Sequence, residues 1–274
     1  GKGVFIAESL IDAEDFCKKV LIEKIFGECS MVVEEYLDGF EMSLLCFVDN
    51  NTIKPLPTVK DHKKIHDGER GLNTGGMGTY SPNSQADIYL PEIESTVLTP
   101  FLDGIKKDAL DFRGIIFIGF MIGTKGIKVL EFNTRFGDPE TQTVLQRLET
   151  DLLDIMLHTS DSNLNGIDIR FNDKKVITLV ISSGGYPEKY ETGCEITGLE
   201  NVSSKVFHAG TAIKDGKPVT SGGRVISLTS CKDTFEEAFN LVYSDAKAVD
   251  FKNKYYRRDI SPLVKRIYVE KKEK

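Results

Sequence analysis

Residues 129–142, with the sequence VLEFNTRFGDPETQ, place the strongest constraint on how this chain folds. Side chains alternate between the two faces of a strand, so Glu131, Asn133 and Arg135 are predicted to share one face and the residues between them the other. The turn-forming GDP sequence ends the strand, and a helix is predicted to begin at Pro139. The segment therefore predicts a strand, a turn and a helix, with three polar side chains aligned on one strand face.

These three residue types favour a metal and phosphate site. A carboxylate and a carboxamide oxygen side by side are hard ligands suited to Mg²⁺, which takes much of its shell from water and substrate phosphates. Arg135 adds a planar set of donors that can bind phosphate or carboxylate in a bidentate manner. The pattern predicts Mg²⁺, phosphate and an acidic substrate. A strand whose polar face only meets water is the alternative.

The composition restricts the class of protein. A chain of 274 residues, 40% hydrophobic and 28% charged, is predicted to fold into one large or two smaller soluble domains. The net charge is -7 and the basic residues are scattered except at the C-terminus, so we expect no nucleic-acid partner. No apolar run approaches the roughly 18 residues that span a bilayer, and the first residues do not form a leader. Five cysteines without a CxxC pair fit reduced thiols. We predict a cytoplasmic protein without a membrane partner.

Apolar periodicity predicts where helices and strands lie. Apolar residues that recur at intervals of three and four predict helices over residues 12–26, 91–111, 140–159 and 234–249. Runs of apolar residues bounded by turn residues predict strands over residues 31–37, 43–48, 115–122, 127–133, 175–182, 206–208 and 222–228. Only a short turn separates 115–122 from 127–133, so these two strands are predicted to form a hairpin.

Residues 52–82 lack apolar periodicity and are predicted to be a functional loop. Polar residues gather around Asp61 and Lys63, and a glycine-rich stretch surrounds Asn73. Backbone amides next to glycine can surround an anion. His62 and His66 lie four residues apart and raise the alternative of a zinc site, but no third ligand lies nearby, which favours solvated loop histidines.

Residues 31–37 end in two carboxylates, Glu34 and Glu35, and Glu41 follows the next turn. A strand that leads into a linker offers a backbone edge to adenine and a carboxylate to ribose. An edge strand closed by acidic turn residues is the alternative. Residues 1–3, GKG, are similar to the end of a loop that covers phosphate, where Lys2 adds charge.

The second half of the chain has a different character. Residues 160–166 are polar and predicted to be a linker, and the short strands and turns beyond it predict a smaller α+β domain. Thr234 and Glu237 form a TxxE capping box at the start of its helix. Residues 255–259, YYRRD, allow either an anion contact or a surface ion cluster.

The longest motifs resemble one enzyme family. VVEEYLDGFEMS, KDHKKIHDGERGLNTGGMGTYSP, VLEFNTRFGDPETQ, SSGGYP, VFHAGT and SGGRVISLT, in this order, are similar to the glycinamide ribonucleotide synthetase (phosphoribosylamine glycine ligase) family of ATP-grasp enzymes. The resemblance implies an α+β fold, a partial ATP-grasp fold followed by a smaller C-terminal α+β domain rich in short strands. It assigns residues 1–36 to the remainder of the small ATP-grasp subdomain, 37–165 to the large subdomain with the metal and substrate site, and 166–274 to the C-terminal domain.

The resemblance also implies an activity and its residues. Such enzymes use ATP with Mg²⁺ or Mn²⁺ to phosphorylate glycine, and 5-phosphoribosylamine then attacks the glycyl phosphate to give glycinamide ribonucleotide, ADP and phosphate. Arg135 matches a catalytic position, and Glu131 and Asn133 match the metal ligands. The implied ATP-binding residues are Lys2, Glu34, Glu35, Leu37 and Glu41. The implied residues for glycine and the ribosylamine are Asp61, Lys63, Asn73, Thr74, Gly75, Gly76, Met77, Asp138, Pro139 and Glu140.

Several departures from the family pattern leave alternatives open. Lys60, Leu72 and Ser261 stand where the family usually has Gln, Pro and Gly, and the strand FIGFMI lacks a second acidic metal ligand. The family's preceding domain and its nucleotide-contacting lysine strand are absent from this sequence, which predicts that the chain cannot complete the reaction alone. A noncatalytic structural module and another ATP-grasp ligase of purine synthesis are the alternatives. A monomer or weak dimer is expected.

Overall fold

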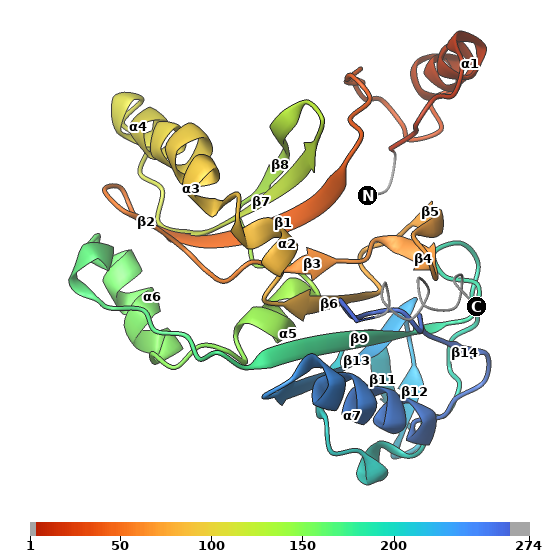
Figure 1. The fold of residues 1–274 in the computed structure, drawn as a ribbon. Helices are drawn as coiled ribbons and strands as arrows, with labels where there is room; N and C mark the ends of the chain where they lie inside the picture. The colour runs from red at the N-terminus through yellow and green to blue at the C-terminus, as the bar shows by residue number, and fades with distance from the viewer. Residues whose placement is uncertain (1–3, 264–274) are drawn as a thin grey trace, which may run out of the picture.

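The computed structural model describes residues 4–263, which form two larger antiparallel β-sheets, separated and covered by helices, and two two-stranded sheets (Figure 1). The first sheet has the order β2-β1-β7-β8, with β1 Phe40–Val48, β2 Ile53–Pro55, β7 Gly114–Gly123 and β8 Gly126–Asn133. The second sheet has the order β10-β13-β9-β6-β3, and β14 also pairs with β9. The fold is therefore α+β, as the sequence predicts. None of the helices formed by residues 4–263 has the length and apolarity needed to span a bilayer.

The outer face of the first sheet is covered by one long helical segment (Figure 1). It consists of α3 Leu90–Ile93, a π-helical turn at Glu94–Leu98 and α4 Thr99–Lys107. Pro100 has no N–H, so the regular α-helical hydrogen bond cannot form there, and Thr99 donates instead to the carbonyl of Glu94. The helix predicted over residues 91–111 is confirmed with this irregularity, although it ends at Lys107. Ile93, Leu98 and Ile105 are buried against the sheet.

The inner face of the first sheet carries both core and polar residues. The predicted hairpin is confirmed, and its register pairs Glu131 with Gly119 and Asn133 with Phe117. At the end of the sheet near Phe117, the inner face packs against helices α5 Glu140–Val144 and α6 Leu152–Ser160. The other end of the same face carries the polar side chains of Glu41, Ser43 and Glu131.

The second sheet joins residues from both halves of the chain. Its longest strands, β9 Lys175–Ser183 and β13 Arg224–Lys232, are covered by helix α7 Phe235–Ala248, which begins at the predicted Thr234 capping box. The other strands are β10 Lys205–His208, β14 Lys254–Tyr255 and the separate hairpin of β11 Thr211–Lys214 and β12 Lys217–Thr220. Strand β6 Gly78–Ser81 pairs with β9, so this sheet extends across the predicted linker at 160–166. The proposed domain boundaries at residues 36 and 165 stay a prediction.

The predictions of secondary structure for residues 31–37 and 52–82 are wrong. Residues 31–37 form no strand: Val32 is 80% exposed, and no strand of the described residues pairs with this segment. Residues 52–82 contain short strands instead of a structureless loop, because they pair with each other and with distant strands. These strands are β2, β3 Lys60–Asp61, β4 Lys64–His66, β5 Arg70–Asn73 and β6.

The helix predicted over residues 140–159 is interrupted between α5 and α6. Asp151 caps α6, since its carboxylate accepts hydrogen bonds from the backbone N–H groups of Leu153 and Asp154. The N–H of Glu149 donates to the carbonyl of Arg170 and not to a carbonyl one helical turn earlier. Glu149 is therefore not part of a helix. The first predicted helix is confirmed as α1 Leu10–Leu21, capped by Ser9 and shorter at its end than predicted.

Candidate functional site

A group of charged side chains lies at the polar end of the inner face of the first sheet. Lys63, between β3 and β4, lies at its centre: its Nζ is 3.3 Å from Glu41 Oε2 and 4.0 Å from Glu131 Oε1. Burial alone lowers the pKa of Lys63, but the carboxylates of Glu41, Asp61 and Glu131 outweigh this effect and raise it. Lys63 is therefore a fixed positive charge. We call Glu41, Asp61, Lys63, Glu131 and Glu140 the charged cluster.

Two carboxyl groups of the charged cluster are buried. Asp61 is 5% exposed and its Oδ1 has no hydrogen-bond partner within residues 4–263, whereas Glu140 accepts a hydrogen bond of 3.2 Å from Ser43 Oγ. Burial raises the pKa of both carboxyl groups, and the negative charge of Glu140 raises that of Asp61 further. A buried oxygen without a donor is costly, so Asp61 is ready to accept a hydrogen bond from a bound ligand.

Two loops predicted to bind substrate contact each other beside the charged cluster. Thr74 is held by Lys63, whose carbonyl accepts from both the N–H and the hydroxyl of Thr74 at 2.7 and 2.8 Å. Gly76 has a φ of +109°, and a Cβ atom there would lie 2.6 Å from Pro139 Cδ and 2.8 Å from Asp61 Oδ1. Only glycine fits this conformation and this space. Met77 is fully buried beneath the loop.

Two residues of the second sheet region hold these loops, and neither was predicted from the sequence. Arg224 Nη1 donates to the carbonyls of Gly75 at 2.7 Å and Asp138 at 2.8 Å, and its Nη2 donates to Asp138 Oδ2 at 2.9 Å. The hydroxyl of Tyr186 accepts a hydrogen bond from the N–H of Gly75 at 3.0 Å. Both residues lie in glycine-rich motifs, SSGGYP and SGGRVISLT, which were the only available signal.

The predicted metal ligands lie side by side on β8. The side chain of Glu131 is 53% exposed and Asn133 is half-buried, so both oxygens can reach a bound ion. Within residues 4–263, no three His, Cys, Asp or Glu side chains are grouped as metal ligands. The two hard oxygen donors still fit Mg²⁺, because this ion takes the rest of its shell from phosphate oxygens and water. His62 is buried against the carbonyl of Gly78 and His66 lies beside Tyr255, which gives no support to a zinc site.

The remaining predicted site residues are not in the charged cluster. Glu34, Glu35 and Leu37 lie in the irregular segment before β1, where Glu35 Oε2 is 2.8 Å from Lys125 Nζ. The exposed Arg135 donates to the carbonyl of Phe136 at 2.8 Å. Lys2 lies outside the described residues. Among the predicted ATP-binding residues that the structure describes, Glu41 is the one that joins the charged cluster.

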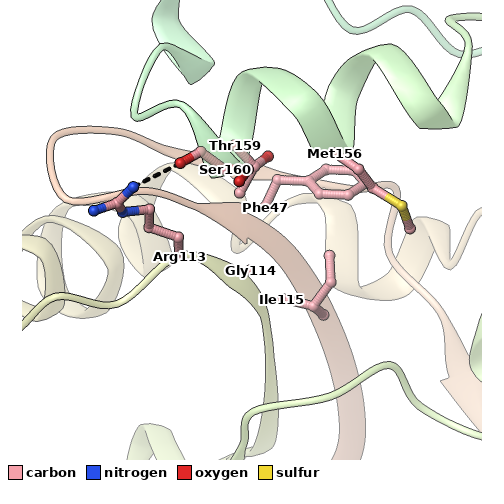
Figure 2. Close-up of a pocket in the computed structure, with 7 residues that line it drawn as sticks. All are labelled: Phe47, Arg113, Gly114, Ile115, Met156, Thr159 and Ser160. Atoms are coloured by element: carbon pink, nitrogen blue, oxygen red, sulfur yellow. Dashed lines mark hydrogen bonds between the residues drawn. The ribbon is translucent and has the colours of Figure 1, made fainter.

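An apolar hollow of about 240 Å³ lies elsewhere, between β7 and α6 (Figure 2). Arg113 spans its rim, with Nη1 donating to the carbonyl of Ser160 at 2.7 Å. None of the predicted site residues is among those that line it, which are Phe47, Arg113, Gly114, Ile115, Met156, Thr159 and Ser160. Since its lining holds no converging acidic groups, the charged cluster is the candidate site.

The histidine beneath the site predicts a pH dependence of stability. Burial and the nearby Arg257 lower the pKa of His62 from 6.5 to about 3. Between these values the unfolded chain binds a proton that the folded chain excludes, so the free energy of unfolding falls as pH drops from 6.5, by at most about 1.4 kcal/mol per pH unit. Urea unfolding at several pH values is expected to show a shallower slope for His62→Asn than for the unaltered chain. Equal slopes would mean that His62 titrates normally in the folded state.

Comparison with known proteins identifies the family. Residues 1–141 match the ATP-grasp (A) domain of phosphoribosylglycinamide synthetase, and residues 176–262 match the C domain of the same enzyme. The chain is 41% identical to a phosphoribosylamine–glycine ligase of Caldanaerobacter subterraneus, covering 95% of this chain and 64% of the relative. It is 45% identical to a bifunctional purine biosynthetic protein of Pichia angusta, covering 95% of this chain and 34% of the relative. The chain thus spans less than two thirds of these relatives.

Solved structures agree with this result. The crystal structure of phosphoribosylamine–glycine ligase from Thermotoga maritima has a TM-score of 0.84 and 34% identity, covering 95% of this chain and 66% of the other. A biotin carboxylase domain bound to bicarbonate has a TM-score of 0.60 at 15% identity, covering 86% of this chain and 52% of the other, which shows only a shared fold. The predicted ATP-grasp fold is confirmed. Since the first domain match alone covers residues 1–141, more than half of the 274 residues, the chain belongs to the phosphoribosylglycinamide synthetase family.

Proposed function

We propose that this chain carries the metal and substrate site of a phosphoribosylamine–glycine ligase. The observation that carries the proposal is the charged cluster, in which Lys63 lies between Glu41 and Glu131 next to the buried carboxyl groups of Asp61 and Glu140. A cation flanked by metal-binding oxygens suits the polyphosphate of ATP, and buried carboxyl groups suit an ammonium group. ATP with Mg²⁺ or Mn²⁺, glycine and 5-phosphoribosylamine are the proposed ligands.

The chemistry requires an activated carboxylate. A carboxylate oxygen of glycine attacks the γ-phosphorus of ATP, the bond to ADP breaks, and glycyl phosphate forms. The amine of 5-phosphoribosylamine then attacks the glycyl carbon, the carbon–oxygen bond breaks, and phosphate leaves with that oxygen. Glu131 and Asn133 would hold the metal ion, which neutralises phosphate charge when bound. Arg135 is proposed to add a further cation for the transferring phosphoryl group.

The chain's own residues position the reactants in this proposal. Lys63 faces the phosphate charge, and the unpartnered Oδ1 of Asp61 accepts a hydrogen bond from the glycine ammonium group. Arg224 holds the loops around Gly75 and Asp138 at a fixed separation, so that both substrates meet in one orientation. No side chain needs to form a covalent intermediate. We also propose that the protein is cytoplasmic and that it is a monomer or a weak dimer.

A substrate comparison tests the proposal. ADP release by the protein that carries this chain is measured with ATP, Mg²⁺, glycine and 5-phosphoribosylamine together, and with each amine omitted in turn. A parallel reaction replaces glycine with bicarbonate. We expect ADP release only when both amines are present. ADP release that depends on bicarbonate and not on glycine would overturn the proposal in favour of another ATP-grasp ligase.

The central lysine gives a more specific prediction. Lys63→Met removes the positive charge between Glu41 and Glu131, so kcat is expected to fall by about 10- to 100-fold, the usual loss when one stabilising group is removed from a transition state. Lys64→Met is the matched control, because the Lys64 side chain forms no hydrogen bond or ion pair with any residue from 4 to 263. Steady-state kinetics that give the same kcat for both variants would exclude Lys63 from the site.

A further inference from the structure

The segment after β14 packs against the β4–β5 hairpin, and Arg257 lies at the centre of this contact. The Arg257 side chain is fully buried. Its Nε and Nη2 donate to the two carboxylate oxygens of Asp259, each at 2.7 Å, and Nη2 also donates to Glu69 Oε1 at 3.0 Å. Its Nη1 donates to the carbonyl of Lys64 at 2.9 Å. We call residues 255–259 the latch. For this segment the sequence allows an anion contact or a surface ion cluster. An ion cluster is present, but Arg257 is buried in it and does not lie at the surface.

Further hydrogen bonds of the latch also lead to the hairpin. Asp259 Oδ2 accepts from the N–H of Gly68 at 2.8 Å, and the N–H of Arg258 donates to Asp67 Oδ1 at 2.8 Å. The hydroxyl of Tyr255 donates to the carbonyl of Ile65 at 2.8 Å. The latch therefore holds strand β4 and the turn of a hairpin that lies about 190 residues earlier in the chain.

The hairpin in turn carries the charged cluster's only lysine. Lys63 directly precedes Lys64, whose carbonyl is bound by Arg257, and Lys64 pairs with Asn73 across the hairpin. The carbonyl of Lys63 also holds Thr74, at the start of the loop beside Asp61. A displacement of the hairpin would therefore move the Lys63 ammonium away from Glu41 and Glu131 and would shift the Thr74 loop with it.

A buried ion pair is an inefficient way to gain stability. Removing a guanidinium and a carboxylate from water costs nearly as much as their attraction returns, and an apolar contact of the same volume would hold the hairpin equally well. The planar guanidinium contributes defined geometry instead, because its hydrogen bonds fix the positions of two carboxylates and one carbonyl relative to one another. This arrangement suits a part of the molecule whose position has to be accurate.

We propose that Arg257 is a positioning residue for the ligase reaction: through the β4–β5 hairpin it holds Lys63 and the Thr74 loop in register with Glu41 and Glu131. This inference rests on the proposed function. Arg257 touches neither the charged cluster nor any proposed ligand directly, so its effect acts through Lys64 and Glu69.

Hydrogen exchange tests the positioning without any assay of activity. Arg257→Lys is compared with Arg258→Lys, a matched control, because the Arg258 side chain is exposed and only its backbone N–H takes part in the contact. In Arg257→Lys, peptides from residues 62–77 are expected to exchange roughly tenfold faster, with α7 unchanged. If Arg257→Lys does not fold, Glu69→Gln is used instead. It removes the ion pair between Arg257 and the half-exposed Glu69, and it is also expected to make residues 62–77 exchange faster.

Kinetics of the protein that carries this chain give the second readout. Misplacement of Lys63 is expected to lower kcat by about 10- to 100-fold in Arg257→Lys, with KM for ATP changed by less than about threefold and no change in Arg258→Lys. Unchanged exchange over residues 62–77 would overturn the inference even if the protein proves to catalyse another reaction. Faster exchange with an unchanged kcat would reduce Arg257 to a structural role and also overturn it.

Discussion

Replacing Glu131 with glutamine is expected to lower kcat/KM of the ligase reaction by about 10²- to 10³-fold, because a neutral carboxamide replaces the one charged ligand proposed to hold the metal ion. The change keeps the size of the side chain, and Glu131 is half-exposed, so folding is expected to be unaffected. The neutral amide also leaves Lys63 with one carboxylate fewer. Initial rates of ADP release at saturating glycine measure the effect.

The dependence on metal concentration separates a metal ligand from a general charge effect. In Glu131→Gln, the Mg²⁺ concentration that gives half-maximal rate is expected to rise, whereas in Glu149→Gln, an exposed carboxylate outside the site, neither rate nor metal dependence changes. A Glu131→Gln variant with the unaltered metal dependence would show that β8 does not hold the ion.

Replacing Gly76 with alanine is expected to lower the free energy of unfolding by about 2–5 kcal/mol. A left-handed backbone costs an L-residue about 1–2 kcal/mol, and forcing a methyl group into a filled space costs about 1–3 kcal/mol more. The methyl group would overlap Pro139 Cδ at 2.6 Å and Asp61 Oδ1 at 2.8 Å. Since both neighbours belong to the proposed substrate loops, substrate binding is expected to weaken as well.

Gly216 provides the matched control for this substitution. It has a similar positive φ of +76° in the turn between β11 and β12, but no heavy atom lies within 4 Å of its added Cβ. Gly216→Ala is expected to cost only the backbone strain, about 1–2 kcal/mol. Urea unfolding of both variants measures the difference. Equal losses for the two variants would show that the loops around Gly76 and Pro139 do not pack as closely as described.

The sequence predicts most of the local structure because local pairing produces it. The β7–β8 hairpin, the strand in β1 and the capped helix α7 follow from alternation, a short turn and a capping box within a few residues. The short strands of residues 52–82 could not be predicted in this way. Strand β6 is a strand because it pairs with β9, about 100 residues later, and local periodicity carries no information about such a partner.

The candidate site, like the fold, could be predicted from the sequence only in part. The two motifs that hold Asp61, Lys63, Glu131 and Glu140 were identified from the sequence, and they meet at one place. Their assigned roles stay predictions. Arg224 and Tyr186 were missed because an arginine and a tyrosine in a glycine-rich turn have no period or spacing that indicates a contact with a loop more than 100 residues away.

Transfer of oxygen from glycine to phosphate tests the proposed reaction most directly. The protein that carries this chain is incubated with ATP, Mg²⁺, 5-phosphoribosylamine and glycine labelled with ¹⁸O in its carboxylate, and the released phosphate is examined by mass spectrometry. If the glycine carboxylate attacks the γ-phosphorus, each phosphate released with the product carries one ¹⁸O atom, and Glu131→Gln forms this labelled phosphate much more slowly. Phosphate that contains no ¹⁸O from glycine would contradict the proposed function.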